Sequence, residues 1–184
     1  DGFFAPNLNP TTGERFRAGK GSLYEGGLKV PYLVRWPNQI AADTVLDHVL
    51  CFQDVMPTLA DLTQADCPPT DGLSFAPTLL GKPGQQSHSH LYWEYVGQTA
   101  VRMGDWKAYK GKNGDWELYD LSKDIQEKVD VAADHPDILQ QLIAHASESH
   151  EPLRPGKVFD RALAAKDHRQ APHATLRKKN GSKK

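Results

Sequence analysis

The chain lacks any apolar run long enough to cross a membrane, and it has only two cysteines, Cys51 and Cys67. A bilayer-spanning helix needs roughly 20 consecutive apolar residues, so we expect no membrane span. Two cysteines do not make the disulfide framework of a small secreted domain, and these two either pair or stay reduced. The N-terminus has no signal peptide, and Asp1 does not look like a natural first residue.

The composition is that of an ordinary soluble globular protein. The chain has 184 residues, of which 39% are hydrophobic and 24% charged. This length allows one or two domains, and neither fraction points to a fibrous or a disordered chain. No internal repeat is evident.

The net charge of −1 hides a strong asymmetry. Ten basic and two acidic side chains follow residue 153, so this tail carries +8 and the residues before it carry −9. A basic tail can bind nucleic acid, acidic glycans or a membrane surface, or it can be a solvated terminus. No aromatic residue follows Phe159, so base stacking has no support and we expect no nucleic-acid partner.

Lys20 is the first candidate for a functional residue because it stands between two glycines. Gly19 and Gly21 allow positive φ and close approach of the backbone to a ligand, and the ammonium is a compact charge with three donors. Gly26-Gly27 predicts a sharp turn, and the apolar run 28–36 predicts a buried strand. A cation on such a loop can hold an anion, although a solvated surface lysine would show the same pattern.

This stretch resembles the second lysine motif of the type I, formylglycine-dependent sulfatases, or arylsulfatases. The matching residues are Lys20-Gly21-Ser22-Leu23-Tyr24-Glu25-Gly26-Gly27, Val30-Pro31 and Arg35-Trp36-Pro37. Lys29 stands where the family more often has arginine. The resemblance runs from about Phe3 to Ser149 and extends to the runs 71–81, 100–107 and 116–121.

The resemblance implies that Lys20 is a catalytic residue that binds the sulfate of the substrate. It implies the C-terminal part of an α/β, alkaline-phosphatase-like fold, with secretion or a periplasmic location favoured. The formylglycine nucleophile and the ligands of Ca²⁺, or of another divalent cation, would lie outside this chain, in an N-terminal part of the same enzyme. We assign no metal ligand here. The substrate would be a sulfated small molecule or a glycan.

The middle of the chain predicts one helix over residues 53–62. Asp54 is a plausible N-cap, and Pro57 is tolerated in a first turn. His48 is a candidate metal ligand or catalytic group, but nothing with ligand spacing accompanies it, which favours a structural role. Cys67 begins a run similar to the formylglycine motif, yet Asp71 stands where arginine is required, so we interpret Cys67 as an ordinary loop cysteine.

Four short aromatic-rich runs between residues 91 and 119 predict a four-stranded antiparallel meander. Gly97, Gly104-Asp105 and Asn113-Gly114 separate the runs, and Asn-Gly is a strong hairpin signal. Pro136 then opens a helix that His135 or Asp134 would cap. The apolar side chains from Ile138 to Ala146 recur at helical spacing and predict the face that covers the sheet.

These observations predict three segments. Residues 1–84 would end a large α/β domain, residues 85–150 would form an antiparallel subdomain of four strands and a helix, and residues 151–184 would be a basic, disordered tail. The predicted function is that of a sulfuric ester hydrolase whose C-terminal portion is inactive alone. The alternatives are a phosphoester or phosphonate hydrolase of the same superfamily, and a non-catalytic module that binds anions or glycans.

Overall fold

The computed structural model describes residues 7–151, so the basic tail predicted from residue 151 onward lies outside the described residues except for Glu151. The contacts divide the chain into two compact units. One unit contains residues up to Val30 together with those from Tyr92 onward, and the other contains Pro31–Leu91. No helix in the described part of the chain is long and apolar enough to cross a membrane.

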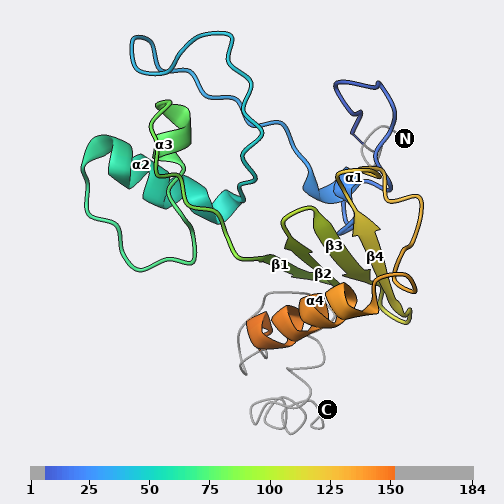
Figure 1. Ribbon diagram of the computed structural model, residues 1–184. Helices are drawn as coiled ribbons and strands as arrows, with labels where there is room; N and C mark the ends of the chain where they lie inside the picture. The colour runs from blue at the N-terminus through green and yellow to red at the C-terminus, as the bar shows by residue number, and fades with distance from the viewer. Residues whose placement is uncertain (1–6, 152–184) are drawn as a thin grey trace, which may run out of the picture. The chain divides into compact units, whose positions relative to one another are not determined.

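Four strands form one sheet in the first unit (Figure 1). The strands are β1 (Leu91–Tyr95), β2 (Gln98–Met103), β3 (Trp106–Lys110) and β4 (Trp116–Asp120), and they lie in the order β1-β2-β3-β4. The pairs β2–β3 and β3–β4 are antiparallel. The predicted meander is confirmed, because short turns leave each strand only its neighbour as a partner. Gly97 and Gly104 occupy two of these turns with φ of 77° and 58°.

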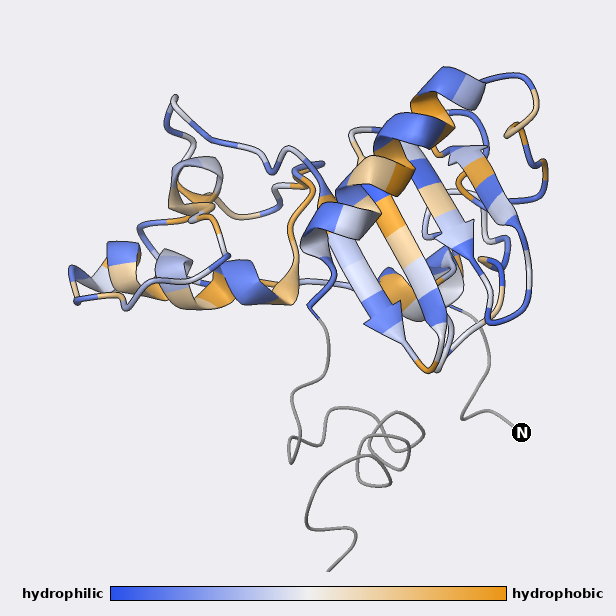
Figure 2. Cartoon of the chain, turned by 90° about the horizontal axis from the view of Figure 1, so that it is seen from below, coloured by the Kyte–Doolittle hydropathy of each residue, from blue (hydrophilic) through white to orange (hydrophobic). Residues whose placement is uncertain are grey.

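Helix α4 (Pro136–Ser149) covers one face of this sheet (Figure 2). Leu142 and Ala146 of the helix pack with Val101, Ala108 and Leu118 of the three strands β2 to β4. His135 is the N-cap and Pro136 the first residue, as predicted, although no side chain caps the helix. This half of the core therefore combines the apolar face of α4, at helical spacing, with alternate side chains of the strands.

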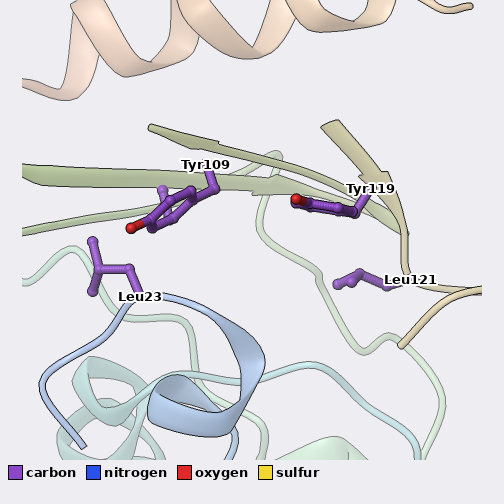
Figure 3. Packing of buried hydrophobic residues seen from close by; sticks show 5 residues of the cluster. Leu23, Tyr109, Tyr119 and Leu121 are labelled. Carbon is purple, nitrogen blue, oxygen red and sulfur yellow. The ribbon is translucent and has the colours of Figure 1, made fainter. Parts of the chain in front are cut away.

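The opposite face of the sheet receives the N-terminal segment of the chain. Leu23 packs with Ala100, Tyr109, Tyr119 and Leu121, and α4 lies beyond the sheet (Figure 3). Helix α1 (Glu25–Leu28) follows Leu23 and is a single turn. Since successive side chains of a strand alternate between faces, Ala100, Tyr109 and Tyr119 point away from α4 while their neighbours point toward it.

The second unit contains three short helices. They are the 3₁₀ helix η2 (Phe52–Asp54), α2 (Val55–Thr63) and α3 (Ala76–Leu79). The helix predicted over residues 53–62 is thus confirmed with a 3₁₀ entry. Asp54 is its N-cap residue, but its side chain makes no cap hydrogen bond to α2 and bonds elsewhere, as described below.

The predicted buried strand over residues 28–36 is wrong. Leu28 ends α1, and residues 29–51 form neither helix nor strand. Val30 is 68% exposed and Leu33 is 90% exposed. A strand that is apolar on both faces needs neighbouring strands and covering helices, and no strand among residues 7–151 pairs with this segment. Gly26-Gly27 is likewise not a sharp turn, because both glycines lie inside α1.

Candidate functional site

Lys20 lies at the tip of a β-turn. The Ser22 amide donates to the Gly19 carbonyl at 3.1 Å, which closes a four-residue turn with Lys20 at its second position. Gly21, at the third position, has φ of 88°. A turn of type II requires positive φ there, which glycine adopts without strain. The turn leaves the Lys20 side chain exposed, so the predicted cation on a glycine-rich turn is present.

The two glycines of α1 allow the Lys20 loop, defined here as residues 17–24, to lie against the helix. A Cβ at Gly26 would stand 2.3 Å from the Ala18 carbonyl oxygen, and a Cβ at Gly27 would stand 2.0 Å from that of Ser22. Both distances are far below van der Waals contact. The Gly26 amide also donates to the Arg17 carbonyl at 3.0 Å. The Glu-Gly-Gly run is therefore a packing surface for the loop.

Strand β2 contacts the same loop through Gln98. The side-chain amide of Gln98 donates to the Gly21 carbonyl at 3.0 Å, and its Oε1 accepts from the Leu23 amide at 3.2 Å. Tyr109 Oη donates to the same Oε1 at 3.1 Å. One side chain of the sheet thus holds the backbone on both sides of Ser22.

A buried ion cluster fixes the start of α1. Lys107 on β3 is fully buried, and its Nζ lies 2.8 Å from Glu25 Oε1 and 2.8 Å from Glu127 Oε1. Glu127 Oε2 accepts from the Glu25 amide at 2.6 Å. Burial raises the pKa of the Glu127 carboxyl, although the charge of Lys107 opposes the rise. A buried charge is tolerated only when it is paired, so the three groups depend on one another.

Arg17, the first residue of the loop, is held by Tyr24 of the same loop, by Tyr119 of β4 and by the Glu127 backbone beyond β4. Its guanidinium lies 4.0 Å above the Tyr24 ring centroid and donates to Tyr119 Oη at 2.6 Å and to the Glu127 carbonyl at 2.7 Å. Tyr24 Oη donates to Glu117 Oε2 at 2.7 Å, and Tyr119 Oη donates to the same oxygen. Burial and these bonds to Glu117 raise the pKa of both phenols.

A second polar cluster lies in the other unit. Asp54 is almost fully buried and accepts hydrogen bonds from the Cys51 amide at 2.8 Å and the Leu73 amide at 2.8 Å. His88 Nε2 lies 2.8 Å from Asp54 Oδ1 and 3.9 Å from Cys51 Sγ. Among residues 7–151, these three side chains are close enough to share a metal ion.

The chemistry of this cluster does not fit Ca²⁺, which takes six to eight oxygen ligands. Burial, with the charge of Asp54, raises the pKa of the Cys51 thiol to about 12, so the thiol stays protonated at neutral pH when no metal is bound. Through its hydrogen bonds to the Cys51 and Leu73 amides, the Asp54 carboxylate joins the start of η2 to the loop before α3. We therefore interpret the cluster as structural and derive no step through a metal.

Among residues 7–151, no other histidine or cysteine belongs to a group that could hold a metal ion. His48 is not a member of the cluster just described. His145 pairs with Glu148, whereas His150 pairs with Glu94. Cys51 and Cys67 are both free thiols, and Cys67 is exposed. The structural roles expected of His48 and Cys67 stay predictions.

The residues that hold the Lys20 loop were missed in the sequence. Gln98, Lys107 and Glu127 are far from Lys20 along the chain, and no spacing rule joins them to it. One signal was available: Lys107 occupies the interior of an apolar strand, where a charged side chain needs a buried partner. The sequence alone did not indicate that this partner is Glu25.

Comparison with known proteins identifies the family. Residues 13–151 match the family described as N-sulphoglucosamine sulphohydrolase, C-terminal. The chain belongs to the type I sulfatase family. It is 35% identical over 144 residues to an uncharacterized sulfatase of Schizosaccharomyces pombe, in a match that covers 70% of this chain and 26% of that protein. It is 33% identical over 159 residues to human arylsulfatase A, with 68% of this chain and 31% of that protein covered.

Solved structures of sulfatases show the same fold. The chain is similar to Ps i-CgsB with a TM-score of 0.70 and 27% identity, covering 92% of this chain and 39% of that one. The same protein in complex with k-i-k-neocarrahexaose gives a TM-score of 0.69 at 28% identity, covering 83% of this chain and 36% of that one. The sulfatase chain thus has the alkaline-phosphatase-like fold, and its four-stranded sheet and helix match the C-terminal part of the family. It spans 26% to 31% of the curated sulfatases named above.

Proposed function

We propose that this sulfatase chain is the C-terminal portion of an enzyme that hydrolyses sulfate esters, and that Lys20 binds the sulfate group. The observation that carries the proposal is the exposed Lys20 at the second position of a turn whose backbone is held by both α1 and the sheet. Positive charge that is already in place stabilises negative charge developing on the sulfate oxygens without reorganisation at the moment of reaction.

The other reacting groups would come from residues outside this chain. When bound, a divalent cation would supply positive charge at the sulfate, and a formylglycine in the N-terminal part would supply the nucleophile. This chain would orient the ester and neutralise charge at the sulfate oxygens through Lys20. Chromogenic sulfate esters should accordingly remain intact in the presence of the 184-residue chain alone, because the formylglycine nucleophile would lie outside this chain.

Exposed apolar side chains support the proposal of a longer enzyme. Leu33, Val45 and Phe52 are each about nine-tenths exposed, at 90%, 89% and 91%. A hollow lined by Phe52, Val55, Met56 and Leu59 belongs to the same unit. Soluble proteins rarely leave large apolar patches uncovered, so we propose that an N-terminal part of the enzyme covers this surface. The match to Ps i-CgsB, solved in complex with k-i-k-neocarrahexaose, favours a glycan over a sulfated small molecule as the substrate.

Kinetics of two lysine variants in the longer enzyme test the role of Lys20. Lys20→Ala should lower kcat by about a hundredfold or more, the usual effect of removing one donor to a developing charge. Lys20→Arg should recover activity only in part, since the planar guanidinium reaches differently. Lys29→Ala is the control, because Lys29 is the exposed C-cap of α1 and its ammonium lies 5.8 Å from the Phe16 ring centroid. Equal and small effects at both lysines would contradict the proposal.

Assays of the longer enzyme with different esters distinguish the sulfatase from the two alternative functions. Turnover of phosphate or phosphonate esters in preference to sulfate esters would favour the phosphoester hydrolase. A full-length protein that binds inorganic sulfate through Lys20 but turns over neither ester would be the non-catalytic, anion-binding module.

A further inference from the structure

Gln98 makes the contacts expected of a residue that sets the position of Lys20. Its Nε2 donates to the Gly21 carbonyl and its Oε1 accepts from the Leu23 amide, at 3.0 and 3.2 Å. Gly21 directly follows Lys20 in the turn. A shift of the Gln98 amide would therefore move the backbone that carries the Lys20 ammonium.

The orientation of the Gln98 amide is fixed by its two backbone partners. The Leu23 amide can only donate and the Gly21 carbonyl can only accept, so Oε1 faces Leu23 and Nε2 faces Gly21. Tyr109 Oη adds a further bond to Oε1 at 3.1 Å. Tyr109 is itself held by stacking on Tyr24, with ring centroids 3.9 Å apart. The amide thus cannot flip without losing bonds at both ends.

The strand position of Gln98 is also restrained. Gln98 is the first residue of β2 and follows a turn in which Val96 and Gly97 both have positive φ, 48° and 77°. Two such residues form the tight hairpin turns that match the twist of a sheet. This turn fixes the Gln98 backbone to the sheet, so the sheet acts as the support and the Lys20 loop as the supported part.

We infer that Gln98 is a positioning residue for Lys20, acting through the backbone at Gly21 and Leu23. The inference rests on the proposed sulfate-binding role of Lys20. It adds Gln98 to the residues on which that role depends. Misplacement of a reacting group by about 1 Å can reduce a rate by up to a hundredfold. A small displacement of Lys20 after loss of the Gln98 hydrogen bonds would therefore be measurable in turnover.

A double-mutant cycle in the longer enzyme tests this inference. Gln98→Met keeps the length of the side chain and removes both hydrogen bonds, and it should lower kcat by about tenfold while changing KM little. Gln98→Glu keeps the acceptor for Leu23 and Tyr109 but sets a carboxylate oxygen against the Gly21 carbonyl, and it should lower kcat at least as much as Gln98→Met. In a Lys20→Ala background, Gln98→Met should have almost no further effect, because coupled sites are non-additive.

Gln126→Met is the matched control. Gln126 is buried and donates to Glu14 Oε2 at 2.7 Å, so it also joins distant segments of the first unit, but this bond lies outside the Lys20 loop. Its effect on kcat should be small and equal with or without Lys20. Melting temperatures of the variants separate a loss of folding from a loss of positioning.

Hydrogen exchange gives a readout that does not depend on turnover. The Leu23 amide should exchange at least tenfold faster in Gln98→Met than in wild type, while amides of β3 stay protected. Unchanged exchange at Leu23, or the same kcat loss from Gln98→Met with and without Lys20, would overturn the inference. A negligible effect of Lys20→Ala with faster exchange at Leu23 would instead overturn the proposed function and keep only the contact.

Discussion

Lys107 Nζ donates to Glu25 Oε1 at 2.8 Å, across 82 residues of chain. This bond joins the middle of the sheet to the first residue of α1, directly after the Lys20 loop. Glu127 completes the cluster, with its Oε1 also 2.8 Å from the lysine Nζ. The arrangement makes the position of α1 depend on the charge of one buried lysine.

Lys107→Met should destabilise the chain strongly. The substitution leaves the carboxylates of Glu25 and Glu127 buried without a cation, which typically costs about 3 to 5 kcal/mol. Lys123→Met is the control, since Lys123 also pairs with a carboxylate, at 2.7 Å, but its side chain is 81% exposed. Lys123→Met should lower the free energy of unfolding by no more than about 1 kcal/mol. Urea unfolding measures the free energy of unfolding of both variants. Similar losses in the two variants would show that the buried cluster contributes little to stability.

Gly27→Ala should destabilise the first unit although alanine favours helices. The new Cβ would lie 2.0 Å from the Ser22 carbonyl oxygen, so the Lys20 loop must move. The gain from helix propensity is only about 1 kcal/mol, less than the usual cost of a backbone clash. A lower melting temperature, with a lower kcat in the longer enzyme, is the expected result. Gly114→Ala, where nothing lies within 4 Å, should change neither quantity.

The phenols of Tyr24 and Tyr119 should make the chain sensitive to alkaline pH. Burial and hydrogen bonds to Glu117 raise the pKa of both above the ordinary value of 10.0. Because the folded pKa values are raised, the stabilisation is complete below pH 10.0 and is lost as the pH rises above it. Absorbance of tyrosinate and circular dichroism should change together in an alkaline titration.

Two variants assign that alkaline transition. Tyr119→Phe removes one of the raised phenols and should broaden the transition or shift it. Tyr95→Phe alters a tyrosine that is 49% exposed at the end of β1 and should leave the transition in place. Formation of tyrosinate from Tyr24 and Tyr119 near pH 10 in the folded chain would show that the bonds to Glu117 are weak.

The two cysteines should differ in their reaction with thiol reagents. The thiolate is the reactive form, and the pKa of the Cys51 thiol, raised to about 12, leaves very little thiolate at pH 8. Cys67 is exposed. The Cys51→Ser variant should therefore keep the fast reaction with a disulfide reagent, and Cys67→Ser should lose it. Rapid modification of Cys51 in the folded Cys67→Ser chain would contradict this interpretation.

The sheet and α4 were predictable because their signals are local. Asn113-Gly114 and the aromatic runs place the strands within a few residues, and Pro136 with the spacing from Ile138 to Ala146 places the helix. Each signal acts through neighbours in the sequence. The Lys20 turn was also predictable, since Gly21 supplies the positive φ that this turn requires.

The failures have a common physical cause. Apolar residues between 28 and 36 resemble a buried strand, but a strand exists only where another strand pairs with it, and an apolar run does not reveal its partner. The bonds of Gln98 and Lys107 to the Lys20 segment likewise depend on contacts between residues 75 to 82 positions apart. Local patterns contain no information on such pairs.

The number of residues between two contacting groups also influences the order in which the contacts form during folding. Strands β2 and β3 meet across a short turn, whereas the bonds of Arg17 to Tyr119 and Glu127 close loops of 102 and 110 residues. Closing long loops has a larger entropic cost and awaits the structure that rewards it. The hairpins can therefore form first and serve as a template, and the segment around Lys20 docks last. On heating, this segment should detach first, so that a sulfatase built in this way loses turnover at a temperature where its antiparallel sheet is still intact.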